Sequence, residues 1–380
     1  MYAYAACEDA VLLYPLYALL FTEHGLSPAA VSSLFALWSL TAFLTEVPSG
    51  VLADLVSRRL LLVVSPLLSA AAFALWTLAP GYGTFAAGFV LWGVGGSLRS
   101  GTWQAHIHAE LAVLGRADAY PRLIGRAEAV GTVSALACAL AAGPVLAAGG
   151  FTAVGLASVA MPLMAAVVAL ALPDTRVRPL PARDHTAPDD AGEGVDEPGA
   201  RQVLREGVAA LRGAAPARAA VVAVAGLAAV LSLDEYLPLL IADTGLALTA
   251  VPLGYGLILA GGAVGGWLAD RGTEHPGRVL AGGGCALALG AFSATPAGLV
   301  GVAVAFGVLR WAAVQADTRL QRETADSSRA TVSSLAGSAA EVTSLASFGL
   351  WALGSAWAGP AVLFGCAALP IVVLAVTWRR

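Results

Sequence analysis

Long apolar stretches of about 18–23 residues recur along the whole chain and constrain its fold more than any other feature. A helix needs roughly 20 such residues to cross the ~30 Å hydrocarbon core of a bilayer. Twelve stretches fit this length, and we therefore predict an all-α membrane protein with twelve transmembrane helices. They cover residues 5–23, 31–53, 60–79, 84–106, 126–148, 152–172, 219–241, 250–269, 278–296, 298–318, 330–353 and 357–377.

The composition agrees with a lipid-embedded chain. Of its 380 residues, 58% are hydrophobic and 12% are charged, whereas a soluble domain has roughly 25% charged residues. The chain contains no Lys, so it lacks the lysine of a Walker A loop and is not itself a P-loop ATP-driven pump. Its 4 Cys are scattered without a Cys/His cluster, so we expect no disulfide framework, metal site or cofactor.

The basic residues, all of them arginine, gather in alternate connections between the predicted spans. These connections carry Arg58 with Arg59, Arg116 with Arg122, Arg271 with Arg278, and Arg319 with Arg322 and Arg329. The connections between them, such as 23–30 and 242–249, contain no basic residue. Because arginine-rich loops stay in the cytoplasm, we expect both termini there and the protein in the cell inner (plasma) membrane.

One long polar segment, residues 173–217, divides the chain. Its first part is rich in Pro, Asp, Glu and Gly, which is typical of a flexible linker. Its second part spaces apolar residues at helical intervals from Val203 to Leu211, which predicts an amphipathic helix on the cytoplasmic surface. The segment separates six spans in residues 1–172 from six in residues 218–380.

The two halves carry two matching motifs in the same order. These are Gly50-Val-Leu-Ala-Asp54 and Gly266-Trp-Leu-Ala-Asp270-Arg271, then Leu98-Arg99 and Leu309-Arg310. Two independent matches favour a parallel duplication, with two six-helix bundles related by a pseudo-twofold axis. Pro15 and Pro238, in the first span of each half, predict local bends.

The loop between the second and third spans resembles the signature loop of the major facilitator superfamily. Its residues here are Gly50, Leu52, Ala53, Asp54, Arg58 and Arg59. Glu46-Val-Pro-Ser-Gly50 and Arg99-Ser-Gly-Thr102 are similar to a prokaryotic subgroup without assigned substrates. The loop departs from the family pattern at Leu55, where a basic residue is common, and at Ser57, where Gly is usual.

The resemblance implies a secondary transporter whose central cavity opens alternately to either side. It also implies that Asp54 and Arg58 or Arg59 form a gating latch at the cytoplasmic face, with Gly266, Asp270 and Arg271 as the abbreviated second copy. Gly50 would then allow close helix packing. The alternative is a loop of charged residues that only fixes the orientation of the chain.

Arg99 and Arg310 are the arginines that fall clearly within predicted spans, each on the order of 10 Å from the cytoplasmic end. Ionisable groups at membrane depth cost roughly 2.5–3.5 kcal/mol or more, so they are candidates for function. The sequence leaves two alternatives open. In the first, one or both arginines line the cavity and attract an anionic group. In the second, they are structurally paired, or their side chains snorkel toward the membrane surface.

The candidate carboxylates for proton coupling or substrate binding are Glu46, Asp234, Glu235 and Glu341. A carboxylate among apolar helices can exchange a proton near neutral pH, which proton coupling requires. A fixed arginine–carboxylate pair is the alternative for each. Glu8 and Asp9 lie near the cytoplasmic end of the first span, where we expect them to be solvated.

The function we favour from the sequence is proton-coupled export of a small organic solute, as in a multidrug or metabolite antiporter. A proton-coupled uptake symporter for a nutrient anion is the second version, and a receptor or scaffold that transports nothing is the third. An enzyme is disfavoured because the chain has neither HExxH nor GxSxG. Expected partners are the solute, protons and lipid, with no nucleic acid, and the chain is expected to be a monomer.

Overall fold

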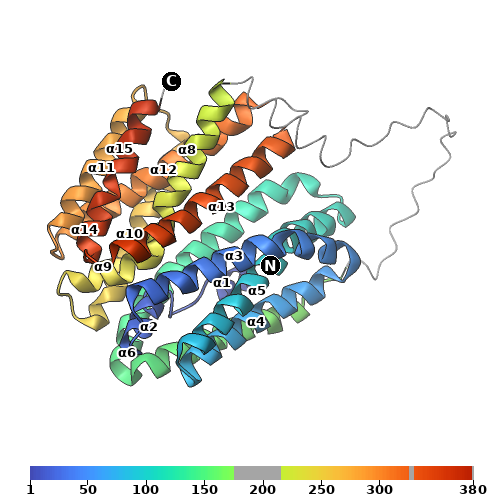
Figure 1. Ribbon diagram of the computed structural model, residues 1–380. Helices are drawn as coiled ribbons and strands as arrows, with labels where there is room; N and C mark the ends of the chain where they lie inside the picture. The colour runs from blue at the N-terminus through green and yellow to red at the C-terminus, as the bar shows by residue number, and fades with distance from the viewer. Residues whose placement is uncertain (175–214, 325–328, 379–380) are drawn as a thin grey trace.

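The described residues form helices and turns alone and lie in two bundles (Figure 1). The computed structural model describes residues 1–174, 215–324 and 329–378. The predicted linker and its amphipathic helix lie almost entirely outside the described residues.

The first bundle contains the helices up to residue 170. They are α1 (Tyr2–Glu8), α2 (Tyr17–Glu23), α3 (Pro28–Leu55), α4 (Arg58–Leu78), α5 (Tyr82–Val113) and α6 (Tyr120–Leu170), with a short 3-10 turn at Ala117–Ala119. Two serines begin long helices here: the Ser27 hydroxyl accepts from the Ala30 N–H at the start of α3, and that of Ser57 accepts from the Leu60 N–H at the start of α4.

The second bundle begins at residue 215. It contains α8 (Ala215–Leu231), η3 (Ser232–Tyr236), α9 (Leu237–Asp243), η4 (Leu248–Ala250), α10 (Val251–Trp267), η5 (Leu268–Asp270), α11 (Pro276–Phe292), α12 (Gly298–Glu323), α13 (Arg329–Gly354), α14 (Pro360–Cys366) and α15 (Ala368–Thr377).

These elements make the twelve predicted crossings within the described part of the chain. Gly149 and Gly150 break α6 into the fifth and sixth crossings, because Gly150 turns the chain with φ +64°. Seven described segments are individually long and apolar enough to span a bilayer, one of them the fused pair. The others are broken, short or interrupted by polar side chains.

The first crossing of each half is broken rather than continuous. Pro15 lies in the break between α1 and α2, where it donates no backbone hydrogen bond to the Val11 carbonyl four residues earlier. Within the break the Leu13 N–H donates to the Ser158 hydroxyl of α6 at 2.9 Å. In the second half, Pro238 follows η3 in the same way, so Asp234 lies in a 3-10 turn instead of a regular helix. The predicted bends are confirmed.

Two helix pairs join the bundles and reveal the symmetry between them. The second crossing, α3, packs against the eleventh, α13, and the fifth, in α6, packs against the eighth, α10. Exchanging the halves converts one pair into the other, as a pseudo-twofold axis requires. The predicted architecture of two related six-helix bundles is confirmed.

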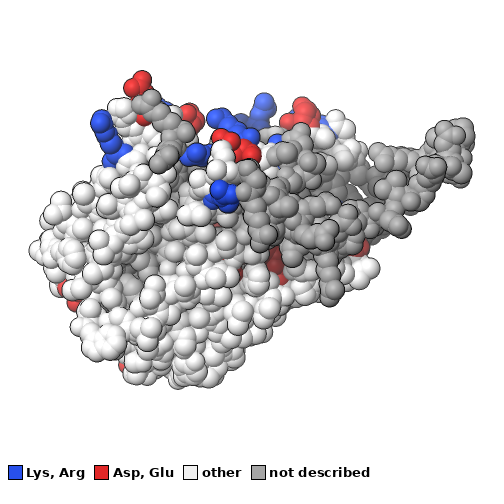
Figure 2. Space-filling view, turned by 45° about the horizontal axis from the view of Figure 1, so that its top comes forward, with Lys and Arg blue, Asp and Glu red and all other residues white. Residues whose placement is uncertain are grey.

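The arginines of the connections lie at one end of the molecule. Figure 2 shows arginines gathered along the top of the described surface, above a broad surface of uncharged residues. This arginine-bearing end contains the α3–α4, α5–α6, α10–α11 and α12–α13 connections. The opposite end contains the α2–α3 and α9–α10 connections.

Candidate functional site

Aromatic and hydroxyl side chains hold the two halves together toward the opposite end. The Tyr236 hydroxyl of η3 donates to the Ser32 hydroxyl of α3 at 2.8 Å. The ring of Phe35, one turn further along α3, meets Tyr236 edge-on at 5.2 Å and lies 5.9 Å from Phe348 of α13. Tyr236 also stacks on Trp351 at 4.0 Å. These side chains are buried or nearly so, and they close the space between the halves on this side.

A cavity of about 800 Å³ lies between the halves on the other side of this closure. It is lined by α6 of the first half and by η3, α10 and α12 of the second half. Its wall runs from Gly125 and Glu128, near the arginine-bearing start of α6, to Asp234 and Tyr255 at membrane depth. The space between the halves is therefore hollow toward the arginine-bearing end and shut toward the opposite end.

Two of the predicted site residues, Asp234 and Arg310, line this cavity together, and their charges are opposite. Arg310 is exposed to the cavity and attracts the half-buried Asp234 electrostatically. The ring of Tyr255 lines the same wall, one helix away on α10. Glu235 is the neighbour of Asp234 in η3 but does not line the cavity, because adjacent residues of a helical turn point in different directions. The structure thus distinguishes two acids that the sequence treats as equivalent.

A second charged cluster lies in the first half around Arg99. Its Nε lies 3.1 Å from Oε1 of Glu8, whose side chain is only 12% exposed, whereas that of Arg99 is 37% exposed. The second Glu8 oxygen is buried and accepts no hydrogen bond from the described residues. Asp9 lies against Gly131 of α6, where a Cβ atom would collide with its carboxylate.

The expectation that Glu8 and Asp9 are solvated was therefore wrong, and Glu8 is the functional candidate that the sequence reasoning missed. The physical reason is that α1 ends at Glu8, and both acids then pack against α5 and α6. The signal was present in the sequence as two adjacent acids inside the first apolar stretch.

Both intramembrane arginines lie far from the ends of their helices. Since α5 continues to Val113 and α12 to Glu323, Arg99 and Arg310 lie roughly 21 Å and 20 Å from those helix ends by the rise per residue. This places both near the middle of their helices, which extend past the predicted spans that end at residues 106 and 318.

Glu341 and Glu46 lie at the contact between α3 and α13. The Ser39 hydroxyl of α3 donates to Oε1 of Glu341 on α13, so a carboxylate bridges the two halves at mid-helix. Glu46 lies two turns beyond Ser39 on the same face of α3, and it is exposed. Neither residue lines the cavity of Asp234 and Arg310, so the predicted residues form separate groups.

The first predicted gating loop is bound to its own half. An Arg58 Nη1 group donates to the Ala105 carbonyl of α5 at 3.2 Å, and one from Arg59 donates to the Leu172 carbonyl at 3.4 Å. Asp174 lies 3.8 Å from the Arg59 Nε and accepts a hydrogen bond from the Ser57 hydroxyl at 2.7 Å. These contacts attach the start of α4 to α5 and to the residues that follow α6.

The second loop, at η5, is bound to α12. The side-chain amide of Gln315 donates to the Ala269 carbonyl at 2.5 Å, and the Trp311 Nε1 group donates to the Arg271 carbonyl at 3.5 Å. The Arg271 guanidinium lies 5.0 Å from the ring centroid of Trp267, in cation–π geometry. This turn carries Asp270 at its end, so the repeat motif is present in both halves.

The expected close packing at Gly50 is absent. No atom lies within 4 Å of the position that a Cβ would take at Gly50, and the same holds at its repeat counterpart Gly266. Both glycines lie toward the arginine-bearing end, where the halves are apart, so nothing reaches them.

Three solved transporter structures share this arrangement of helices. A bacterial homolog of the human lysosomal transporter Spinster, inward-facing and unoccupied, has 15% identity and a TM-score of 0.68 over 99% of this chain and 92% of that one. The nucleoside transporter NupG has 12% identity and a TM-score of 0.69 over 99% and 95%. A bacterial homologue of the iron transporter ferroportin, inward-facing, has 14% identity and a TM-score of 0.71 over 99% and 96%.

At these identities the likeness is one of fold alone. No curated protein sequence matches the chain. The sequence model of the Major Facilitator Superfamily, however, matches residues 5–359, nearly the whole chain. The twelve crossings in two related bundles, with a cavity between them, agree with that match. The chain therefore belongs to the Major Facilitator Superfamily and is a membrane transporter rather than an enzyme.

Proposed function

We propose that this transporter exports a small organic solute by proton-coupled alternating access. The observation that carries the proposal is the 800 Å³ cavity between the halves, which Asp234 and Arg310 line together and which is shut toward the opposite end. A cavity open to one side, with a titratable acid in its wall, provides what an antiporter needs to bind solute and proton in turn.

Asp234 is the proposed proton carrier. Ionised, its carboxylate is attracted by the Arg310 guanidinium; protonated, it releases that guanidinium to other partners. Solute binding and protonation thus compete for the same pair of side chains. The Glu8–Arg99 pair is a second group of the same kind in the first half, with one carboxylate oxygen unpartnered among the described residues.

Switching between states would involve both ends of the molecule. Opening the opposite end requires the Tyr236–Ser32 hydrogen bond to break, and moving α3 along α13 requires the Ser39–Glu341 bond to break. Closing the arginine-bearing end would fill the empty space at Gly50 and Gly266. In that state we propose that the loops of Asp54 with Arg58 or Arg59, and of Asp270 with Arg271, act as the gating latch.

The proposed orientation places the arginine-bearing end in the cytoplasm, with both termini, in the cell inner membrane. Its support is the gathering of arginines at one end in Figure 2. The proposed domain division is two bundles, residues 1–172 and 218–380, tied by the cytoplasmic linker 173–217. On this reading, the cavity opens to the cytoplasm.

The experiment is transport in proteoliposomes. Nucleosides, sugars, dipeptides and lipophilic cations are first screened by thermal shift on the purified protein, and binders are then tested for movement against an imposed pH gradient. Asp234→Asn should lose transport driven by the gradient but keep exchange of labelled for unlabelled compound. Asp243→Asn is the matched control, because Asp243 ends α9 outside the cavity and its Oδ2 accepts the Ala361 N–H at 3.4 Å. Full gradient-driven transport by Asp234→Asn would refute the proposed proton carrier.

One observation favours the second candidate, uptake of a nutrient anion with protons. Arg310 is exposed in the cavity wall, where its guanidinium can bind a carboxylate or phosphate of a solute. The same liposomes distinguish the two functions. With an inward proton gradient, a symporter accumulates an anionic compound inside the liposomes, whereas an antiporter expels its solute. A receptor or scaffold would bind a compound and move none.

A further inference from the structure

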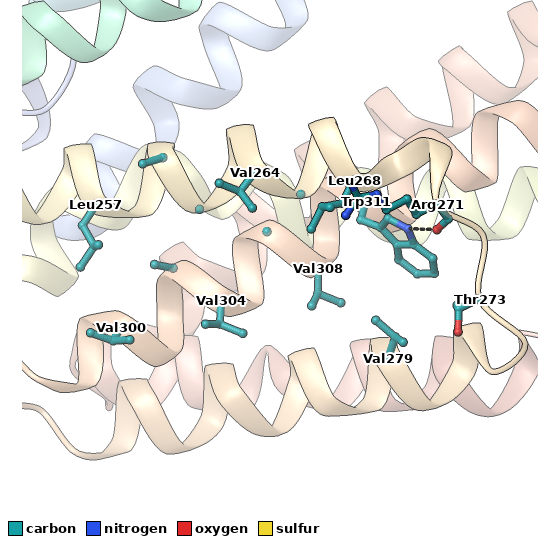
Figure 3. A pocket seen from close by; sticks show the side chains of 15 residues that line it. Leu257, Val264, Leu268, Arg271, Thr273, Val279, Val300, Val304, Val308 and Trp311 are labelled. Atoms are coloured by element: carbon teal, nitrogen blue, oxygen red, sulfur yellow. Dashed lines mark hydrogen bonds between the residues drawn. The ribbon is translucent and has the colours of Figure 1, made fainter.

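A second hollow lies on the outer face of the second half, away from the central cavity (Figure 3). It is a groove of about 620 Å³ formed by α10, α11 and α12. α10 separates the two spaces: Tyr255 and Gly262 face the central cavity, whereas Leu257, Gly261 and Val264 line the groove. The groove therefore faces the lipid.

Close backbone packing makes the floor of the groove. A Cβ atom at Gly261 or Gly265 of α10 would collide with the backbone of Ala303 or Gly307 of α12, so the two helices touch without side chains between them. The walls are aliphatic side chains left exposed, such as Val304, which is 52% exposed. Figure 3 shows these side chains along the full length of the groove.

The groove ends in positive charge at the arginine-bearing end. Trp311, Arg271 and Thr273 lie together at that end in Figure 3, and Arg271 and Thr273 are exposed. Thr273 and Trp311 also line an adjoining polar pocket of about 260 Å³, together with Arg319, Arg322, Gln315 and the acidic Glu323. Among the residues that line the two spaces here, three arginines (Arg271, Arg319 and Arg322) stand against one glutamate.

The length of the groove matches one leaflet. From Leu257 to Leu268 along α10, the rise per residue gives roughly 16 Å, close to half of the ~30 Å hydrocarbon core. The apolar part thus has the length of an acyl chain, and Arg271 lies at its arginine-bearing end.

We propose that this groove is a binding site for one anionic phospholipid of the leaflet at the arginine-bearing end. One acyl chain lies on the glycine floor between α10, α11 and α12, and the phosphate lies between Arg271 and Arg322. Charge decides the class of lipid, because a headgroup with net negative charge is attracted where a zwitterionic one gains little. This site does not depend on the transported solute or on proton coupling.

The test measures lipid binding by native mass spectrometry on the purified full chain in detergent. Phosphatidylglycerol should bind with one tight site per chain, and phosphatidylcholine with the same acyl chains should bind less tightly. Arg271→Gln and Arg322→Gln should each weaken phosphatidylglycerol about fivefold, which corresponds to about 1 kcal/mol for a basic side chain at the membrane surface. Arg278→Gln is the charge control, since Arg278 is exposed at the same end but lines neither pocket.

The acyl-chain part of the site is tested by filling the groove. Val304→Trp should weaken phosphatidylglycerol at least as much as the loss of one arginine, whereas Leu289→Trp should not, because Leu289 is 75% exposed on α11 outside the groove. If Val304→Trp fails to fold, a second measurement uses phosphatidylglycerol with brominated acyl chains, which should quench the fluorescence of Trp311. Trp311→Phe should then remove the part of the quenching that comes from Trp311.

Three results would overturn the proposal. Equal affinity for phosphatidylglycerol and phosphatidylcholine would show that charge does not determine binding. Equal affinity for glycerol phosphate without chains would remove the role of the groove. A protein dimer that Val304→Trp dissociates, with no bound lipid, would assign the groove to a second copy of the chain.

Discussion

Replacing Glu8 by Gln should expose how much the intramembrane pair with Arg99 contributes to stability. The substitution keeps the size of the side chain and removes its charge, so Arg99 remains near the middle of α5 without its carboxylate. Arg99→Gln makes the reverse change. The double variant removes both charges and with them the cost of leaving one unpaired.

The separation of 3.1 Å between Arg99 Nε and Glu8 Oε1 sets the magnitude. With an effective dielectric constant of about 20, Coulomb's law gives roughly 5 kcal/mol of attraction. The Arg99 side chain is 37% exposed, so solvent screens part of this attraction, and desolvation of the nearly buried Glu8 offsets more. We therefore expect a coupling energy of about 2 kcal/mol, between the values for exposed and buried pairs.

The assay is a double-mutant cycle of denaturant unfolding in detergent micelles. Each single variant should lose about 2–3 kcal/mol, and the double variant should be less destabilised than the sum of the two. Glu8→Gln combined with Arg278→Gln is the control, because Arg278 lies in the other half, and its effects should add within about 0.5 kcal/mol. A Glu8–Arg99 coupling below about 0.5 kcal/mol would refute the ion pair.

Three further predictions concern packing, gating and orientation. Gly88→Ala should lower the free energy of unfolding by about 1–3 kcal/mol, because its Cβ would collide with the indole of Trp76. Gly83→Ala is the control and should not change stability, because no atom lies within 4 Å of its Cβ position. Equal melting temperatures for the two variants would contradict this. Tyr236→Phe removes the hydrogen bond to Ser32, which contributes about 1 kcal/mol. The fraction of molecules that are open at the opposite end should therefore rise about fivefold, and a cysteine placed there should be labelled faster. An unchanged labelling rate would argue against that contact as a gate. A cysteine in any arginine-bearing connection should react with an impermeant maleimide only after the cells are permeabilised, and labelling of intact cells would reverse the proposed orientation.

Much of the architecture could be predicted from hydropathy and repeats. The turn at Gly149–Gly150 was placed correctly because two glycines interrupt an apolar run that is twice the length of one crossing. Arg99 and Arg310 were recognised as intramembrane groups because charge is rare in such runs. The ends of their helices were placed too early, because α5 and α12 continue to Val113 and Glu323.

The candidate site was predicted only as a set of residues, without its pairings. The sequence offered four acids as partners for Arg99, whereas its partner is Glu8, 91 positions away and set aside as solvated. Glu341 pairs with a serine, Ser39, rather than with an arginine. No spacing rule reaches such contacts, because they depend on which helices pack side by side and on how each is rotated.

The sequence by itself determined the number of crossings, the duplication and the end at which the arginines gather. These are local properties: each apolar run has its own length against the bilayer, and each arginine its own place in a connection. Only the tertiary structure decided that Asp234 rather than Glu235 lines the cavity, that Glu8 is buried, and that α10, α11 and α12 leave a groove open to lipid. The reason is that a side chain's surroundings come from neighbouring helices distant in sequence, and a proline break or a glycine contact can change which face of a helix they meet.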